Sequence, residues 1–449
     1  MKLSWPTNTI PFWTKKTEKS LWGKYRKTMW ILIVIALITL FYVFINFFTS
    51  LGDNNLVPHT ETPVSLEDMD QFQTVLAASI NSSVEPSGAT SILTDGDEFL
   101  ADLLTHIESA QKSILITNFI WDNWEFGTKI FTAMTKRANE WIRVRVLLDG
   151  VWWALASDES IEKLTEAGWV VAYFRPLRWW NINRFGRRSH IRNIVIDGKV
   201  GYLWGIAISD SWLGKGDTPD SWHDYMFRTE WPTTNRMESV FYTLWAQTTG
   251  EIMTPERPQF SKSMVRGNLV SLLSSPSPDM SSSMEQYIWL SITAAKKSIH
   301  IENPYLVPSK SLLEALKNKA REGVDVSIII PGNKTDAPYT RWASHSYYLQ
   351  MLEAGVKLYE FQPSKLHAKT MVFDEKWSII GSANLDNRSS RINLEFILGL
   401  DDPLLAKNLE ISFQKDINNS KQVSLEEQKD RSILFFPLEL FAKLFSHQY

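Results

Sequence analysis

Two short stretches of the chain share one pattern of reactive side chains: a histidine, a cation two residues later, and an aspartate five residues after that. They are His190, Arg192 and Asp197 in the first stretch, and His367, Lys369 and Asp374 in the second. A neutral histidine can attack phosphorus, and a charged one can donate a proton. Arginine and lysine supply the positive charge that a phosphodiester requires. The pattern therefore predicts phosphoryl transfer that two histidines share.

Within each stretch, the spacing of these six candidate catalytic residues predicts which of them share one face of a β-strand. Residues two apart on a regular β-strand point to the same side, so each histidine and its cation form a pair. Asp374 lies seven residues after His367 (374 − 367 = 7), and Asp197 lies seven after His190. An odd step turns both aspartates away from the pair. We therefore expect Asp197 and Asp374 to fix the turns before the next strands.

Further hydrogen-bond donors follow the second stretch but not the first. Ser382 offers a hydroxyl and Asn384 an amide N–H to a bound phosphate. Ala207 stands where the first stretch would carry the matching asparagine. Losing one such donor can cost about 3–4 kcal/mol of transition-state stabilisation. This departure, together with Arg192 in place of lysine, leaves open a weakly active or non-catalytic lipid-binding protein.

The two stretches lie in two copies of one longer unit. Residues 112–118 (KSILITN) match residues 297–303 (KSIHIEN). Helical patterns and then strand-like runs follow, at 128–140 and 143–148 in the first copy and at 310–321 and 325–330 in the second. This alternation predicts an α/β fold with buried, largely parallel strands.

Composition shifts divide the chain into seven segments. These are a basic flank (1–28), an apolar run (29–48), a linker (49–87), the first unit (88–260), a second linker (261–283), the second unit (284–415), and a polar segment with a C-terminal amphipathic helix (416–449). The second linker contains the Ser- and Pro-rich sequence SSPSPDMSSS.

The apolar run 29–48 carries no charge. Twenty helical residues would cross a hydrocarbon core of about 30 Å, so we expect an uncleaved, single-pass transmembrane helix rather than a signal peptide. Lysines and arginines precede the run. Positive-inside bias therefore puts the N-terminus in the cytoplasm and the main body on the periplasmic side of a bacterial inner membrane.

Two other segments suit a lipid surface. Residues 177–189 place arginines among aromatic rings, as would suit anionic lipid, single-stranded nucleic acid or a loop over the core. Apolar residues recur at helical spacing in 434–445, which fits either an interfacial helix or a helix docked on the core.

The composition of the 449 residues excludes several classes of protein. There is no cysteine, so thiolate catalysis and cysteine-ligated metals are excluded. Net charge is 47 − 50 = −3, and with the apolar run it argues against a nucleic-acid partner. No metal-binding spacing such as His-Glu-x-x-His occurs, and we expect neither a metal nor a cofactor. Twenty tryptophans predict some rings facing lipid and others in cores.

These motifs resemble the phospholipase D superfamily, whose mark is two copies of His-x-Lys-x4-Asp-x6-Gly-Ser/Gly-x-Asn. The second half is most similar to bacterial cardiolipin synthases, in the stretches NPYLVPSKSLLEAL and LHAKTMVFDEKWSIIGSANLDNRS. The resemblance implies two tandem α-β-α sandwich units that form one pseudo-symmetric body. It also implies that an acid from each copy orients the histidine of the other. Glu395 would then hold His190, and Asp224 would hold His367.

The same resemblance implies an activity. Two phosphatidylglycerol molecules would give cardiolipin and glycerol through a phosphatidyl-histidine intermediate, on a membrane and without a cofactor. Hydrolysis or head-group exchange by the same site is the alternative chemistry. The family assigns the nucleophile to the first motif, but here the complete motif is the second, so the sequence leaves the two roles open. It also leaves the oligomeric state open.

Overall fold

A computed structural model describes residues 25–41, 58–119, 121, 125–151, 165–176, 187–255, 264–274 and 282–430. The chain divides into two compact units, Met1–Asn54 and Asn55–Tyr449, and each is considered by itself. The basic insert at 177–186 and the amphipathic pattern at 434–445 lie outside the described residues.

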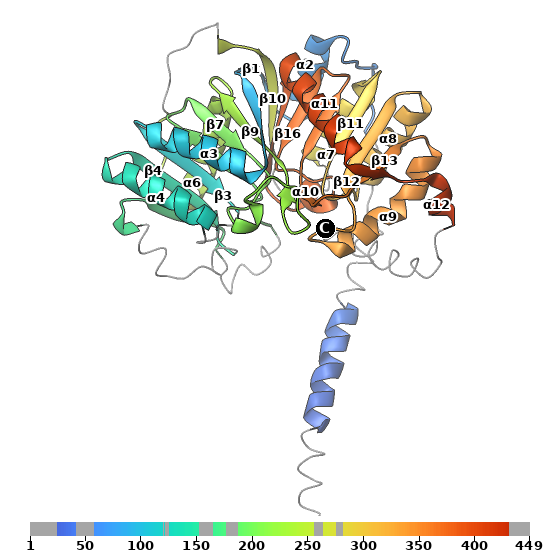
Figure 1. Cartoon of the computed structure of the whole chain (residues 1–449), viewed down its shortest axis with the longest axis horizontal. Helices are drawn as coiled ribbons and strands as arrows, with labels where there is room; N and C mark the ends of the chain where they lie inside the picture. Colours follow the sequence, from blue (N-terminus) through green and yellow to red (C-terminus); the bar gives the residue numbers. More distant parts are fainter. Residues whose placement is uncertain are drawn as a thin grey trace, which may run out of the picture. The chain divides into compact units, whose positions relative to one another are not determined.

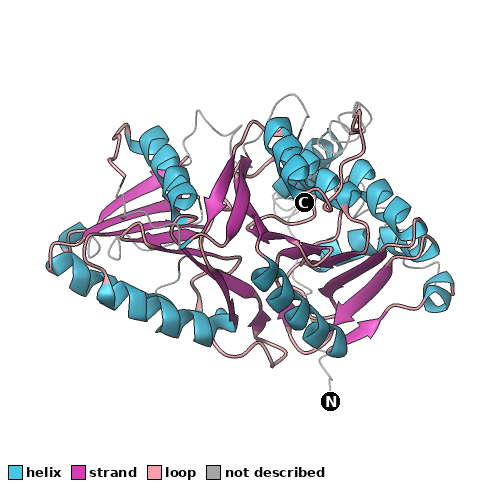
Figure 2. Ribbon diagram, turned by 90° about the horizontal axis from the view of Figure 1, so that it is seen from above, coloured by secondary structure: helices cyan, strands magenta, loops and turns pink. Residues whose placement is uncertain are grey.

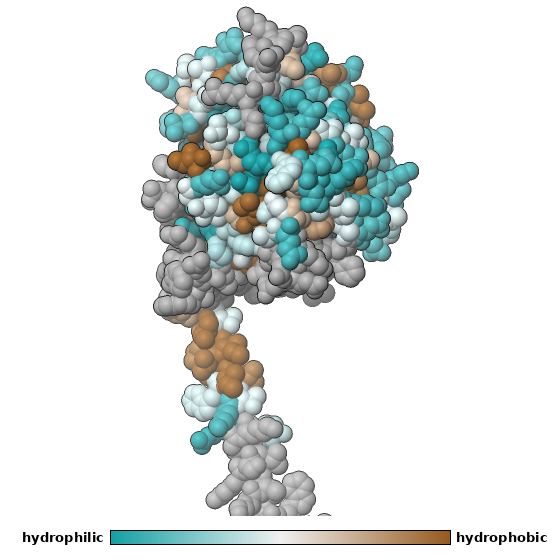
Figure 3. Space-filling view, turned by 90° about the vertical axis from the view of Figure 1, so that its left-hand side faces the viewer, coloured by the Kyte–Doolittle hydropathy of each residue, from teal (hydrophilic) through white to brown (hydrophobic). Residues whose placement is uncertain are grey.

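The N-terminal unit contains a helix at residues 25–41, and the rest of the expected span, 42–48, lies outside the described residues. The apolar side chains of this helix are exposed, including Leu32, Ile38 and Phe41. They form the hydrophobic stretch shown in brown in Figure 3. Among the residues that the structure describes, no helix is both long enough and apolar enough to cross a membrane.

The larger unit contains one sheet for each copy of the repeat (Figure 1). The strands of the first sheet, in spatial order, are β2 (Thr90–Thr94), β9 (Tyr225–Glu230), β7 (Val200–Leu203), β6 (Asn193–Ile196), β3 (Ser113–Asn118), β4 (Arg143–Asp149) and β5 (Val170–Phe174). Those of the second are β1 (Val84–Ser87), β10 (Gly267–Ser274), β17 (Glu395–Asp401), β16 (Trp377–Gly381), β15 (Thr370–Phe373), β11 (Ser298–Glu302), β12 (Asp325–Pro331), β13 (Lys357–Phe361) and β18 (Ser420–Gln422).

Comparison of the two strand orders confirms the internal repeat. The order β2-β9-β7-β6-β3-β4-β5 corresponds, strand for strand, to β10-β17-β16-β15-β11-β12-β13. The expectation of largely parallel strands was wrong. Only β3-β4-β5 and β11-β12-β13 pair in parallel, and the other ladders of both sheets are antiparallel. Strands joined by helical crossovers pair in parallel, as the alternation of helices and strands predicts. The motif segments fold instead as antiparallel hairpins, which that alternation does not reveal.

Two segments interpreted as linkers belong instead to the second sheet. β10 lies inside 261–283 and pairs along its whole length with β17. β1 lies inside 49–87 and pairs with β10, and the preceding helix α2 (Met69–Ser79) contributes Phe72 and Leu76 to the same core. β1 contains Pro86, which an edge strand tolerates, and a Ser- and Pro-rich run follows β10, so both segments have the composition of linkers.

Helices cover the sheets and define three hydrophobic cores (Figure 2). In one core, α3 (Asp95–Ser109) and α4 (Glu125–Asn139) pack against the first sheet. The second sheet packs α2, α7 (Ser283–Ala294), α8 (Lys310–Arg321) and α9 (Pro338–Glu353) in another. The third core joins the two copies through α6 (Thr234–Thr249) and α11 (Pro403–Asn418). Two short helices, α10 (Asn387–Arg391) and α12 (Leu425–Lys429), lie in the second copy of the repeat and after α11, respectively.

Many of the tryptophans belong to these cores. Trp169, Trp204, Trp245 and Trp377 are among the largest fully buried side chains. Trp204 precedes the glycine of the first motif but packs against Phe99, with ring centroids 5.4 Å apart. It therefore fills the core of the first sheet.

Candidate active site

Each motif histidine directly follows a short segment that runs beside the other copy. Strands β8 (Trp222–His223) and β14 (Lys365–Leu366) pair in parallel, and the backbone N–H of His367 donates to the carbonyl of His223 at 2.8 Å. In the same way, the N–H of His190 donates to the carbonyl of Leu394 at 2.9 Å. Each histidine is thus fixed, through its backbone, to the residue that precedes an acid of the other copy.

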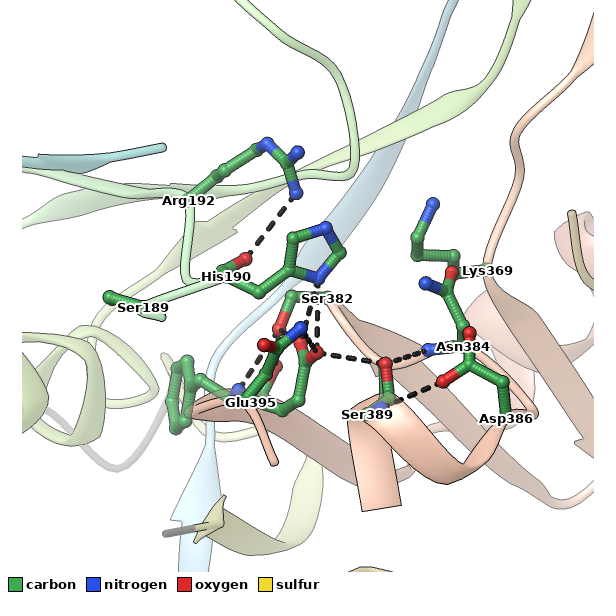
Figure 4. Close-up of polar contacts among 12 residues, drawn as sticks. Ser189, His190, Arg192, Lys369, Ser382, Asn384, Asp386, Ser389 and Glu395 are labelled. Carbon is green, nitrogen blue, oxygen red and sulfur yellow. Dashed lines mark hydrogen bonds and ion pairs between the residues drawn. The ribbon is translucent and has the colours of Figure 1, made fainter. Parts of the chain in front are cut away.

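The imidazole of His190 contacts that acid directly. Its Nδ1 lies 3.0 and 3.1 Å from the two carboxylate oxygens of Glu395, which is fully buried. Ser382 and Ser389 also donate their hydroxyls to Glu395, at 2.5 and 2.8 Å (Figure 4). A carboxylate with this many donors is fixed in position, and it sets which ring nitrogen of His190 carries the proton. The Nε2 atom of His190 makes no hydrogen bond to any described residue.

His367 has the corresponding arrangement. Its Nδ1 lies 2.9 Å from an Asp224 oxygen, while the other Asp224 oxygen accepts the N–H of Tyr225 at 2.8 Å. The placement of Glu395 and Asp224 is therefore the crossed one that the resemblance implies. Gly205 of the first motif lies against this pair: a Cβ there would come within 2.6 Å of Asp224 Oδ2.

The two motif cations are buried without a carboxylate partner among the described residues. Lys369 donates to the carbonyl of His367 at 2.8 Å, and its Nζ lies 2.8 and 3.1 Å from the two ring nitrogens. Arg192 donates to the carbonyl of His190 at 3.3 Å and lies over the ring of Phe119, and its buried Nε has no partner. Two desolvated positive charges beside two histidines form a site for an anion.

Burial dominates the protonation of these groups. It lowers the pKa of His367 well below its ordinary value, and the charges of Lys369 and Arg192 lower it further. Burial also lowers the pKa of His190, although Glu395 opposes the change. The pKa of Lys369 falls to about 7 for the same reason. Attack on a phosphodiester requires one neutral imidazole as the nucleophile, and a bound anion would favour the charged forms of Lys369 and of the second imidazole.

Burial raises the pKa of the Asp224 carboxyl to about 7, while Lys369, the Tyr225 N–H and His223 oppose this rise. Burial thus opposes the carboxylate form, which accepts the Nδ1–H of His367, and these three neighbours favour it.

Asp197 and Asp374 do not join the histidines. Asp374 accepts the backbone N–H groups of Lys297 and Ser298, at 2.7 and 3.0 Å, and that of Lys296. Asp197 does the same for residues 111–113. Both adopt φ of 54°, in the left-handed region that aspartate tolerates. They fix the starts of β11 and β3, as strand parity indicates.

The two donors after the second motif differ in their surroundings. Ser382 uses its hydroxyl on Glu395 and accepts the N–H of Phe396 at 3.0 Å, so its role is to orient Glu395 rather than to bind a phosphate. Asn384 is buried, and its Oδ1 has no partner (Figure 4 shows it beside Lys369). Ala207 is buried in the first core.

Several residues around the site were missed from the sequence. Ser389, on α10, bonds to Glu395. The stacked rings of Trp212 and Trp222 are both nearly perpendicular to the ring of His367, at centroid distances of 4.9 and 5.4 Å. Arg188, in the basic segment for which lipid, nucleic acid and the core were all possible contacts, is buried with its guanidinium 3.5 Å from Asp149. Of these residues, only Ser389 could have been found from the sequence, because it lies a few residues after the second motif, in SANLDNRSS. The described residues contain no cluster of acids and histidines suited to a metal ion.

Comparisons with known proteins agree on one family. Residues 288–417 match the family model described as cardiolipin synthase, PLD-like domain. The chain is 32% identical over 346 residues to cardiolipin synthase 2 of Staphylococcus epidermidis, covering 76% of this chain and 71% of that protein. It is 32% identical over 370 residues to cardiolipin synthase of Halalkalibacterium halodurans, covering 82% and 73%.

Among solved structures, phosphatidylserine synthase of Haemophilus influenzae is similar in fold. The TM-score is 0.64 at 17% sequence identity, and the match covers 84% of this chain and 97% of that one. The sequence matches, the duplicated sheets and the paired histidine motifs lead to one conclusion: the chain belongs to the cardiolipin synthase family of phospholipase D-like phosphatidyltransferases.

Proposed function

We propose that the protein joins two phosphatidylglycerol molecules into cardiolipin and releases glycerol. The observation that carries this proposal is the pair of histidines, each held at Nδ1 by a buried acid of the other copy. Beside them lie two buried cations that have no carboxylate partner among the described residues. The arrangement provides two ring nitrogens and one anion site, which suits a reaction with two transfers at the same phosphorus.

The reaction has two balanced steps. In the first, Nε2 of one histidine attacks the phosphorus of phosphatidylglycerol, a P–N bond forms, and the P–O bond to glycerol breaks. The other histidine begins this step protonated on both ring nitrogens, and it gives its Nε2 proton to the departing glycerol oxygen. In the second, that histidine takes the proton from a hydroxyl of a second phosphatidylglycerol, whose oxygen attacks phosphorus while the P–N bond breaks. Both histidines return to their starting states.

Charge on the phosphate oxygens increases as each bond forms, and the buried cations oppose it. Lys369 and Arg192 are desolvated before the lipid arrives, so they need no solvent rearrangement during the reaction. Asn384 adds an amide group, and Glu395 and Asp224 stabilise each imidazolium as it forms.

The substrate is a membrane lipid, and the exposed apolar helix at 25–41 supports a membrane anchor. Thr39, its most polar central residue, donates its hydroxyl to the carbonyl of Ile35 at 2.8 Å, so this group is satisfied without water. We place the body on the outer side of a bacterial cell membrane. A protease added to intact spheroplasts should then digest the body, and protection until lysis would reverse the orientation.

The activity is tested by incubating the purified protein with phosphatidylglycerol vesicles and following the lipids over time. Cardiolipin and glycerol in equal amounts support the proposal, and His190→Ala and His367→Ala should each abolish both. Phosphatidic acid as the main product would instead indicate hydrolysis. No product, with vesicle binding retained, would indicate a non-catalytic homologue, to which Ala207 and Arg192 would then be relevant.

A further inference from the structure

We propose that His223 is a positioning residue: a buried cation, clamped between Asp95 and Asp416, that keeps Asp224 ionised and in place behind His367. The proposal rests on the proposed transfer reaction, because it concerns the acid that orients one of the two histidines. His223 lies outside both motifs, on β8, and is 4% exposed.

The clamp joins the two copies of the repeat. Nδ1 of His223 lies 2.8 Å from Asp95, at the start of α3 in the first copy, and Nε2 lies 2.8 Å from Asp416, near the end of α11 in the second. The ring stacks on Phe361 of β13, with centroids 5.0 Å apart and planes 12° apart. Two carboxylates that each accept one ring N–H require both nitrogens to be protonated, so the ring is an imidazolium.

The clamp connects to the site through three backbone contacts. Asp95 also accepts the N–H of Asp224 at 3.2 Å, and its own N–H donates to the carbonyl of Asp224 at 3.1 Å. The carbonyl of His223 accepts the N–H of His367. Both members of the His367–Asp224 pair are therefore attached to His223 or to its partner, so a displaced ring would move both.

The charges around His223 come from every element packed against it. Asp95 and Asp416 bind the ring, Tyr225 of β9 donates its hydroxyl to Asp416 at 2.6 Å, and Glu302 of β11 and Asp224 lie next to them. Burial opposes charge on His223, but the hydrogen bonds to Asp416 and Asp95 outweigh it and raise its pKa to about 10.

Glu302 does not compete for this cation. Burial and the charge of Asp416 raise the pKa of Glu302 well above its usual range, so Glu302 is neutral. The cation therefore opposes the burial that raises the pKa of Asp224. Without it, Asp224 would bind a proton at neutral pH and could no longer accept the Nδ1–H of His367.

The chain contains a matched control for this cluster. His300 of β11 also binds an acid of α11, with Nδ1 2.7 Å from Glu410, and also stacks on a phenylalanine, Phe413, at 4.6 Å and 7°. It makes no contact with Asp224 or His367 among the described residues. His300→Gln therefore breaks the same type of interaction with the same helix, α11, away from the reacting groups.

The test compares His223→Gln, His300→Gln and wild-type full-length protein on phosphatidylglycerol vesicles, with kcat/KM measured from pH 5.5 to 9. Loss of one neighbouring buried charge should move the acid limb of the His223→Gln profile upward by about one to two pH units. Its kcat/KM should then be about 10-fold below wild type at pH 7 and approach wild type near pH 9. The ratio for His300→Gln should be the same at every pH.

A purely structural role for His223 would lower activity by one factor at all pH values, and that result would overturn the proposal. If the wild type makes no cardiolipin, the proposed function fails instead, and NMR still tests the clamp. In protein labelled with ¹⁵N-histidine, one ring should stay doubly protonated at pH 8.5. The same measurement serves if His223→Gln does not fold, and a wild-type spectrum in which every ring is neutral at pH 8.5 contradicts the proposal.

Discussion

The close approach of Gly205 to the Asp224–His367 pair allows one methyl group to test the geometry of the site. In Gly205→Ala, the new Cβ would lie 2.6 Å from Asp224 Oδ2, 3.1 Å from Lys369 Nζ and 3.3 Å from His367 Nδ1. Ordinary contact begins near 3.4 Å, so the carboxylate oxygen must move by about 0.8 Å (3.4 − 2.6). Moved directly away from the new Cβ, it would lie about 3.2 Å from Nδ1 instead of 2.9 Å, so the hydrogen bond would be longer and weaker.

The size of the effect is limited by the bond that is weakened. A hydrogen bond to a charged group contributes about 1.5–3 kcal/mol, so complete loss would lower kcat/KM by about 10- to 150-fold if the bond acts in the transition state, and we expect a decrease of about 10-fold for the weakened bond. The substitution adds one methyl and breaks no core contact, so the melting temperature should change little. The assay is the rate of cardiolipin formation from phosphatidylglycerol vesicles, with thermal unfolding measured on the same preparations.

Gly201→Ala provides the control within the same motif segment. Its Cβ would meet the end of the Met237 side chain, at 2.5 Å from Sδ, which is flexible and lies in the core rather than the site. We expect activity within about threefold of wild type for this variant. A Gly205→Ala protein as active as Gly201→Ala would refute the inference that the position of Asp224 controls His367.

Three further predictions concern the motifs themselves. Asp374→Ala should lower the free energy of unfolding by about 3 kcal/mol, because three backbone N–H groups lose their acceptor, yet leave kcat of the folded fraction near wild type; a large loss of kcat at unchanged stability would contradict this role. For the free enzyme, kcat/KM should fall as the pH rises through about 7, because Lys369 loses its proton there, and Lys369→Arg should move this limb to higher pH; a limb that stays in place would assign it to another group. Phosphatidylglycerol labelled with ³²P, mixed briefly with enzyme and quenched in denaturant at high pH, should leave label on one histidine-containing peptide, that of His190 or of His367, and label on neither would exclude the covalent intermediate.

The sequence predicted much of the site because its signals are local or repeated. The spacing of His367 and Lys369, and the match to His190 and Arg192, follow from side-chain alternation on a strand and from duplication. The same parity correctly placed Asp374 on the turn. The crossed acids, Asp224 and Glu395, came from family resemblance, since nothing in their own surroundings indicates a partner more than a hundred residues away.

What the sequence could not predict depends on contacts between distant residues. Ser382 has a hydroxyl that could bind a phosphate. Only the three-dimensional arrangement shows that this hydroxyl donates to Glu395 instead. Arg188 reads as part of a basic surface, yet Asp149 makes its burial possible. β10 and β1 lie in segments whose composition indicates linkers, because a Ser- and Pro-rich run follows β10 and β1 contains a proline. Only their pairing with β17 and with each other shows that they belong to the sheet.

The crossed pairing of acids and histidines removes the redundancy that duplication usually provides. A protein with two independent copies of a site can lose one and retain part of its activity. Here a change at Asp224 in the first copy acts on His367 in the second, and a change at Glu395 acts on His190. Neither copy is a spare for the other. Two defective chains, each damaged in a different half, could restore function in one cell only by exchanging whole halves between molecules.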